Sequence, residues 1–152
     1  MSIFGELDAK EIPNNPFFIP AGEYSGVVSN AEIKEDRTGQ LRLNIEYTIS
    51  DDNAYHGKTV RDSFRIFPGL TRADFEMLQP KEKSEIASEQ SRLKQRLCGD
   101  PAFDDPGLGV NPEDLNDDNW DPKSLVGTMV DLTITNSADG RYTNVRTARI
   151  VQ

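Results

Sequence analysis

Arginine and other polar side chains recur at alternate positions in two short stretches of the chain, a spacing suited to contacts with a polyanion. In the first stretch, Arg42 and Asn44 flank the apolar Leu43. Guanidinium groups pair with phosphates, and flat aromatic rings stack on nucleic-acid bases of any identity. Arginine is also ordinary on the wet face of a strand, so a solvated face is the competing interpretation. The candidate binding residues, including two expected to adjoin from the C-terminal part of the chain, are Arg42, Asn44, Arg61, Ser63, Arg65, Phe67, Tyr142 and Arg146.

Catalytic signatures are missing from the sequence. It contains no G-x-x-x-x-G-K-[ST] loop, no G-x-S-x-G elbow and no H-E-x-x-H helix. His56 is the single histidine and stands beside Gly57 in a predicted turn, so a metal or general-base role lacks partners. Cys98, the single cysteine, excludes an intramolecular disulfide and is interpreted as a small buried side chain. We therefore predict a non-enzymatic protein without cofactor or metal, in a reducing, cytoplasmic setting.

The negative charge of the chain is concentrated in one segment. The net charge is −9 at pH 7, and between Gly99 and Asp121 eight Asp and Glu residues stand without any Lys or Arg. Setting those eight aside leaves 18 acidic residues against 17 basic ones, so the rest of the chain is close to neutral. The segment predicts a solvated loop, or an acidic mimic of nucleic acid that competes for a basic groove or recruits partner proteins.

A calcium site is the other interpretation of this acidic segment. Asp114, Asn116 and Asp118 alternate as in the first half of an EF-hand loop. Asn119 stands where the loop needs glycine, and Leu125 stands where a bidentate carboxylate should close the coordination shell. The pattern therefore argues against a specific calcium site.

Three strands are predicted in the first half of the chain. Residues 23–34 change the parity of their apolar positions, which indicates a β-bulge in a long bent strand. Residues 41–49 alternate strictly between apolar and polar side chains, the pattern of a half-buried strand. A third strand is expected over 58–67, with Val60, Phe64 and Ile66 facing inward. Residues 1–20, which contain three prolines, are predicted to form an extended arm pinned by Phe17, Phe18 and Ile19.

Helices and two further strands are predicted in the second half. A short helix is expected from the Thr71 cap to Leu78, and a second one from Pro80 to its end at Gly99. Residues 99–123 are predicted to be an acidic, Pro-rich loop, with Trp120 as a plug that anchors it, and residues 99–121 are expected to lie outside the core. Strands over 128–136 and 142–151 flank an Asp139-Gly140 hairpin turn.

This order of elements predicts one mostly-β domain over residues 1–152. Three strands, a helix and two strands are the element order of the OB-fold, a five-stranded, partly open barrel. Its second and third strands commonly bind oligonucleotides. No apolar run is long enough to span a bilayer, so no membrane association is expected.

Short segments across most of the chain carry a family resemblance, namely Pro20–Tyr24, Ala31–Lys34, Tyr55–Lys58, Leu93, Leu125–Gly127 and Tyr142–Val145. In these segments the chain resembles a phage-encoded family of OB-fold proteins, described as single-stranded-DNA-binding and found among replication and recombination genes. The opening Met1–Gly5 is similar to members from phages of actinobacteria. The resemblance implies binding of single-stranded DNA with little sequence preference; the alternative is a protein-contact module, in the virion or as an acidic inhibitor of a host protein. The resemblance does not indicate an oligomeric state. Under this resemblance, the proteins recruited by the acidic segment would be replication or recombination proteins of the phage or host.

Overall fold

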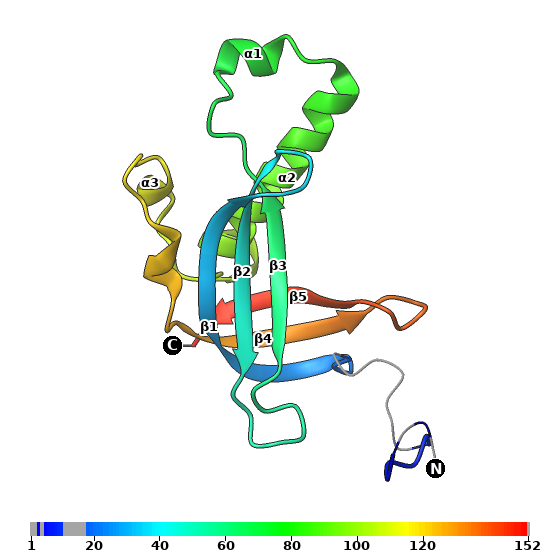
Figure 1. Ribbon diagram of the computed structural model, residues 1–152. Helices are drawn as coiled ribbons and strands as arrows, with labels where there is room; N and C mark the ends of the chain where they lie inside the picture. The colour runs from blue at the N-terminus through cyan, green and yellow to red at the C-terminus, as the bar shows by residue number, and fades with distance from the viewer. Residues whose placement is uncertain (1–2, 4, 11–17, 152) are drawn as a thin grey trace.

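A long bent strand, β1 (Gly22–Glu35), organises the fold in the computed structural model, which describes residues 3, 5–10 and 18–151. Residues 22–27 of β1 pair with β4 (Met129–Asn136), and residues 26–35 pair with β2 (Leu41–Ile49). The β1–β2 register shifts between Val28 and Asn30, which confirms the predicted bulge. Figure 1 shows β1 curving from the β4 side of the sheet to the β2 side.

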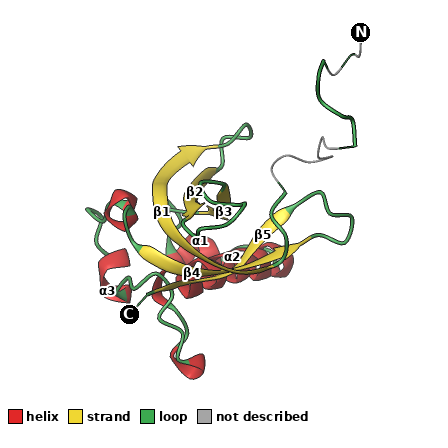
Figure 2. Cartoon of the chain, turned by 90° about the horizontal axis from the view of Figure 1, so that it is seen from below, coloured by secondary structure: helices red, strands yellow, loops and turns green. Residues whose placement is uncertain are grey.

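The five strands form one antiparallel sheet in the order β3-β2-β1-β4-β5. The outer two are β3 (Thr59–Arg65) and β5 (Thr143–Ile150), and the curvature of β1 brings them into contact without a ladder between them. Figure 2, seen from below, shows how strongly β1 bends. The sheet is not closed, so the predicted barrel is not confirmed.

The core lies on the concave side of this sheet and follows the alternation of its strands. Leu43, Ile45, Tyr47 and Ile49 of β2 are buried, as their period of two predicts. Ile19 is fully buried in the same core, so the predicted pinning of the arm is confirmed at this residue. Phe18 is half-buried, and Phe17 lies outside the described residues.

Helices α1 (Arg72–Glu76) and α2 (Pro80–Cys98) lie between β3 and β4 in the sequence. The Thr71 hydroxyl accepts a hydrogen bond from the Asp74 backbone N–H at 3.0 Å, which confirms the predicted cap. Gly99 ends α2 with φ of +80°, a conformation that favours glycine. Only Leu97 of α2 is fully buried, and none of the described helices is long and apolar enough to cross a membrane.

The predicted exclusion of residues 99–121 from the core is wrong at Leu108. This side chain is only 3% exposed and belongs to the main hydrophobic cluster, against which Leu115 and Trp120 also pack. Trp120 therefore anchors the segment, as predicted, whereas Phe103 is 78% exposed. The segment is also not a bare loop: it contains two short helices, η1 (Pro101–Phe103) and α3 (Pro112–Leu115), and a third, η2 (Pro122–Leu125), directly follows it.

Several of the acidic side chains in this segment form turns. The carboxylates of Asp100, Asp105, Asp117 and Asp121 each accept a hydrogen bond from the backbone N–H two residues later. This local pairing is the usual reason for Asp in turns. Half of the eight acidic residues therefore have a conformational role.

Candidate nucleic-acid interface

The register of β2 and β3 places the predicted residues of these two strands on one outer face. Arg42 lies opposite Arg65, and Asn44 lies opposite Ser63. Arg61 lies opposite Glu46, and the intervening residues of both strands are buried. The predicted parity is therefore confirmed for Arg42, Asn44, Arg61, Ser63 and Arg65, which we call the β2–β3 face.

Each arginine of the β2–β3 face contacts a carboxylate, which the sequence analysis did not anticipate. Arg42 Nε lies 2.9 Å from Asp36 Oδ2, and Arg61 Nη2 lies 3.2 Å from Glu46 Oε2. Arg65 Nε lies 3.9 Å from an oxygen of Glu89, a residue of α2. The β2–β3 face is therefore almost balanced in charge rather than strongly basic.

Asp36 is held ionised by its surroundings. Its Oδ1 atom accepts hydrogen bonds from the Thr38 hydroxyl at 2.6 Å and from the Thr38 backbone N–H at 2.8 Å. The Thr38 hydroxyl and the Arg42 guanidinium together hold the pKa of Asp36 well below its ordinary value. The β1–β2 turn thus fixes the position of one arginine of the face.

Phe67 lies beside Arg65 at the end of the β2–β3 face. The centroid of its ring is 5.7 Å from Arg65 Cζ, within the range of a cation–π contact. The Phe67 side chain is half-buried rather than fully exposed to solvent. A stacking base would therefore share this ring with the guanidinium.

A shallow hollow of about 220 Å³ adjoins the face between β1 and β3. Asn44, Glu46 and Arg61 line it together with Lys34 and Glu32 of β1. Lys34 Nζ lies 3.7 Å from a Glu32 carboxylate oxygen, so this cation is also paired. The hollow extends the mixed charge of the face across three strands.

Tyr142 and Arg146 do not join this face. Tyr142 is 64% exposed and immediately precedes β5. The β4–β5 hairpin extends away from the arrowhead of β3 (Figure 1), and Arg65 is the last residue of that strand. Arg146 lies on β5 and lines a different cavity, together with Arg92 and Arg96 of α2. The strands curve so that β5 meets β3 beneath α2, which the linear order of elements does not predict.

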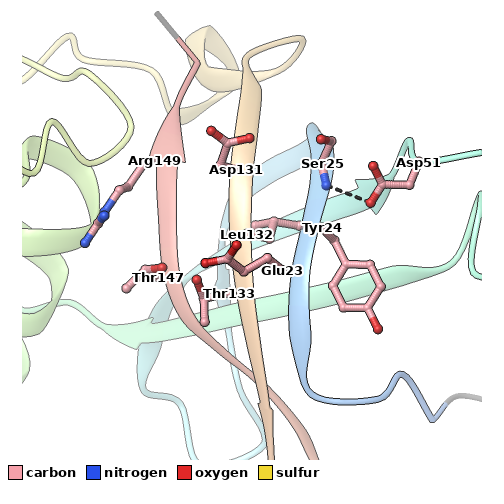
Figure 3. A pocket seen from close by; sticks show the side chains of 9 residues that line it. All are labelled: Glu23, Tyr24, Ser25, Asp51, Asp131, Leu132, Thr133, Thr147 and Arg149. Atoms are coloured by element: carbon pink, nitrogen blue, oxygen red, sulfur yellow. Dashed lines mark hydrogen bonds between the residues drawn. The ribbon is translucent and has the colours of Figure 1, made fainter.

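The outer side of β1, β4 and β5 is acidic, unlike the almost balanced β2–β3 face. A hollow of about 420 Å³ is lined there by Glu23, Asp51, Asp131 and Arg149, among other residues (Figure 3). Asp51 Oδ2 accepts a hydrogen bond from the Ser25 backbone N–H at 2.9 Å. Three carboxylates against one guanidinium make this surface unfavourable for a phosphate backbone.

The chain matches no known protein-family model, and no curated protein shows significant similarity to it. The assignment of a function therefore depends on the residues described here. Within 3, 5–10 and 18–151, no group of three or more His, Cys, Asp and Glu side chains is arranged to hold a metal ion. His56 is exposed, with Nδ1 2.9 Å from the Asp51 carbonyl oxygen.

A buried polar network joins the core to α2 and was missed by sequence reasoning. Asp62 is 7% exposed, and its Oδ2 accepts a hydrogen bond from the Tyr47 hydroxyl at 2.7 Å. Arg96 Nε lies 2.9 Å from the same oxygen, although it has no aligned hydrogen-bond acceptor. Burial raises the pKa of Asp62, while Arg96 and the Tyr47 hydroxyl oppose that shift. The signal was present in the sequence, since Asp62 occupies the inward parity between Val60 and Phe64.

Arg96 also spans the open side of the sheet. Its Nη2 donates to the carbonyl oxygens of Val145 at 3.0 Å and Arg146 at 3.3 Å. The guanidinium thus links β3, through Asp62, to β5 at the place where no ladder joins these strands. Cys98, at the end of the same helix, is half-buried with its pKa raised by burial, in line with the predicted packing role.

Proposed function

We propose that this chain is a partly open OB-type barrel that binds single-stranded DNA without catalysing a reaction. The barrel is supported by a bent β1 shared between β2 and β4, and by contact between β3 and β5. A helix between the third and fourth strands is a further feature of this arrangement. As the sequence resemblance implies, the protein would act in the host cytoplasm during replication or recombination of a phage.

The observation that carries the binding proposal is the direct opposition of Arg42 and Arg65 across the β2–β3 ladder. Like charges directly opposite one another destabilise a sheet unless they are compensated, here by Asp36 and Glu89, and a phosphate bound between the two guanidiniums would compensate them in the same way. Phe67 places an aromatic ring next to this pair. Two guanidiniums beside a ring match the alternation of phosphate and base in a single strand.

The carboxylates on the face do not prevent such binding, although they weaken it. An exposed ion pair contributes about 0 to 1 kcal/mol, so a phosphate can replace Asp36, Glu46 or Glu89 at small cost. Single-strand binding has a salt slope of about 0.7 per phosphate neutralised. Three arginines therefore give a slope of about 2 at most, lower than for a strongly basic groove.

Titration of a fluorescein-labelled oligo-dT with the full chain, followed by anisotropy at several salt concentrations, tests the proposal. The expected result is saturable binding that weakens as salt rises and is stronger than binding to the oligo-dT·oligo-dA duplex. Absence of binding to oligo-dT at low salt would refute it.

A protein-contact module is the second candidate, favoured by the charge balance of the β2–β3 face and by the acidic hollow of Figure 3. A surface of paired charges suits a partner with its own mixed charges better than a uniform polyanion. Absence of binding to oligo-dT at low salt would favour a protein-contact module over single-stranded-DNA binding.

A further inference from the structure

A cavity of about 240 Å³ lies where α2 passes beside β5, and arginines from both elements line it. Its walls come from α2, β5, the segment after α2 and Phe64, which lies on the buried side of β3. None of the residues of the β2–β3 face lines it. We call it the arginine pocket. Its polar lining residues are Arg92, Gln95, Arg96, Asp105, Arg146 and Thr147.

Positive charge exceeds negative charge in the arginine pocket, although the chain as a whole carries −9. Asp105 is the single carboxylate of the lining, and its Oδ1 is already engaged by the Gly107 backbone N–H at 2.8 Å and by Arg149 Nε at 3.4 Å. The charge of Arg96 is balanced by the buried Asp62, and Arg92 Nη1 lies 3.4 Å from a carboxylate oxygen of Glu89. In the described part of the chain, no carboxylate pairs with the exposed Arg146 side chain.

Two of the three guanidinium groups of the arginine pocket are held in place by contacts within the protein. Arg96 is fixed by its two carbonyl acceptors on β5 and by Asp62. Arg92 Cζ lies 5.2 Å from the centroid of the Phe64 ring, which also lines the pocket. Preorganised side chains lose little conformational freedom on binding, which favours affinity.

We propose that the arginine pocket binds a phosphate group. Guanidinium groups match the geometry of phosphate oxygens, and the Thr147 hydroxyl and Gln95 amide supply neutral donors at the same cavity. Pockets for drug-sized ligands occupy about 300–1,000 Å³, so this smaller cavity suits a phosphate rather than a whole nucleoside. The site does not depend on the β2–β3 face, so either can fail without the other.

Titration of the full chain with sodium phosphate at constant ionic strength, balanced with sodium chloride, tests this site through the NMR signals of the arginine Nε–H groups. The expected result is a saturable shift of the Arg92 and Arg146 signals. Arg146→Ala should weaken the affinity by about tenfold or more, since a charge-assisted hydrogen bond is lost. The matched control is Arg72→Ala, an exposed arginine of α1 outside the pocket, which should leave the affinity unchanged.

The source of the phosphate is distinguished by a second arm with oligo-dT carrying or lacking a 5′-phosphate. Tighter binding of the 5′-phosphorylated strand, lost in Arg146→Ala, assigns the pocket to a strand terminus. Saturable binding of inorganic phosphate without that difference assigns it to a free phosphate or another phosphate ester. Shifts that grow linearly without saturation, or equal losses in Arg146→Ala and Arg72→Ala, would overturn the proposal. An Arg61→Ala variant separates the arginine pocket from the β2–β3 face, because this variant should still bind phosphate.

Discussion

Arg96 Nε lies 2.9 Å from Asp62 Oδ2, which ties α2 to the inner side of β3 in a nearly dry environment. The Tyr47 hydroxyl donates to the same carboxylate, and burial raises the pKa of Tyr47 so that it remains a donor. Because Arg96 also holds two carbonyl groups of β5, this contact fixes the open side of the sheet. It therefore holds α2 and β5, which supply most of the walls of the arginine pocket, next to β3.

Asp62→Ala should lower the free energy of unfolding by about 3 to 5 kcal/mol, because it leaves the Arg96 charge buried without its partner. Tyr47→Phe removes one hydrogen bond and should cost about 1 kcal/mol. Urea denaturation of the three proteins measures both differences. A loss in Asp62→Ala no larger than that in Tyr47→Phe would show that the ion pair is not a main contact of α2.

Leu108→Ala should lower the free energy of unfolding by about 2 to 5 kcal/mol, since this side chain belongs to the main core. Phe103→Ala is the matched control from the same segment, and its 78% exposed ring predicts a change within about 0.5 kcal/mol. Thermal unfolding followed by circular dichroism compares the two variants. Equal stability of the two variants would contradict a core role for Leu108 and would support a loop outside the core.

The two outcomes at Leu108 and β2 show what the sequence could and could not predict. The alternation from Leu41 to Ile49 is local, so the strand and its buried side follow directly from the residue order. Leu108 enters the core where distant parts of the chain meet, since the backbone N–H of Ile150 donates to the carbonyl oxygen of the adjacent Gly107 at 2.7 Å. No spacing along the chain encodes that contact.

The same limit applies to the candidate site. The parity of β2 and β3 correctly places their polar residues on one face, whereas the partners of the arginines come from a turn and from α2. Asp36 and Glu89 reach the face only after the chain has folded. Arg146, which is expected to adjoin this face, lies at the arginine pocket instead, because the curvature of the sheet carries β5 to α2.

Asp36→Asn should reduce stability more at pH 6 than at pH 2.5. The folded-state pKa of Asp36 is below its ordinary value, so its ionised form favours the folded state. That contribution is fully present above the ordinary pKa of about 3.8 and is lost as the pH falls toward the folded-state pKa. Urea denaturation of wild type and variant at both pH values gives the comparison. A difference that grows as the pH falls would contradict this sign.

Arg61→Ala and Glu46→Gln should change single-strand affinity in opposite directions. Arg61→Ala removes a phosphate contact and should lower the salt slope by about 0.7. Glu46→Gln releases Arg61 from its carboxylate while keeping a side chain that can bond to the Ser29 hydroxyl, and binding should tighten up to about fivefold. Anisotropy with labelled oligo-dT measures both effects. Weaker binding in Glu46→Gln would indicate that the carboxylate positions the arginine rather than competing for it.

The location of a bound strand is tested most directly by NMR, in a titration of the ¹⁵N-labelled chain with unphosphorylated oligo-dT. The account predicts saturable shifts in the backbone amides of Arg42, Asn44, Arg61, Ser63, Arg65 and Phe67, together with smaller shifts across the acidic hollow of β1, β4 and β5. Shifts confined to that acidic hollow, or no saturable shifts at low salt, would contradict single-strand binding by the β2–β3 face.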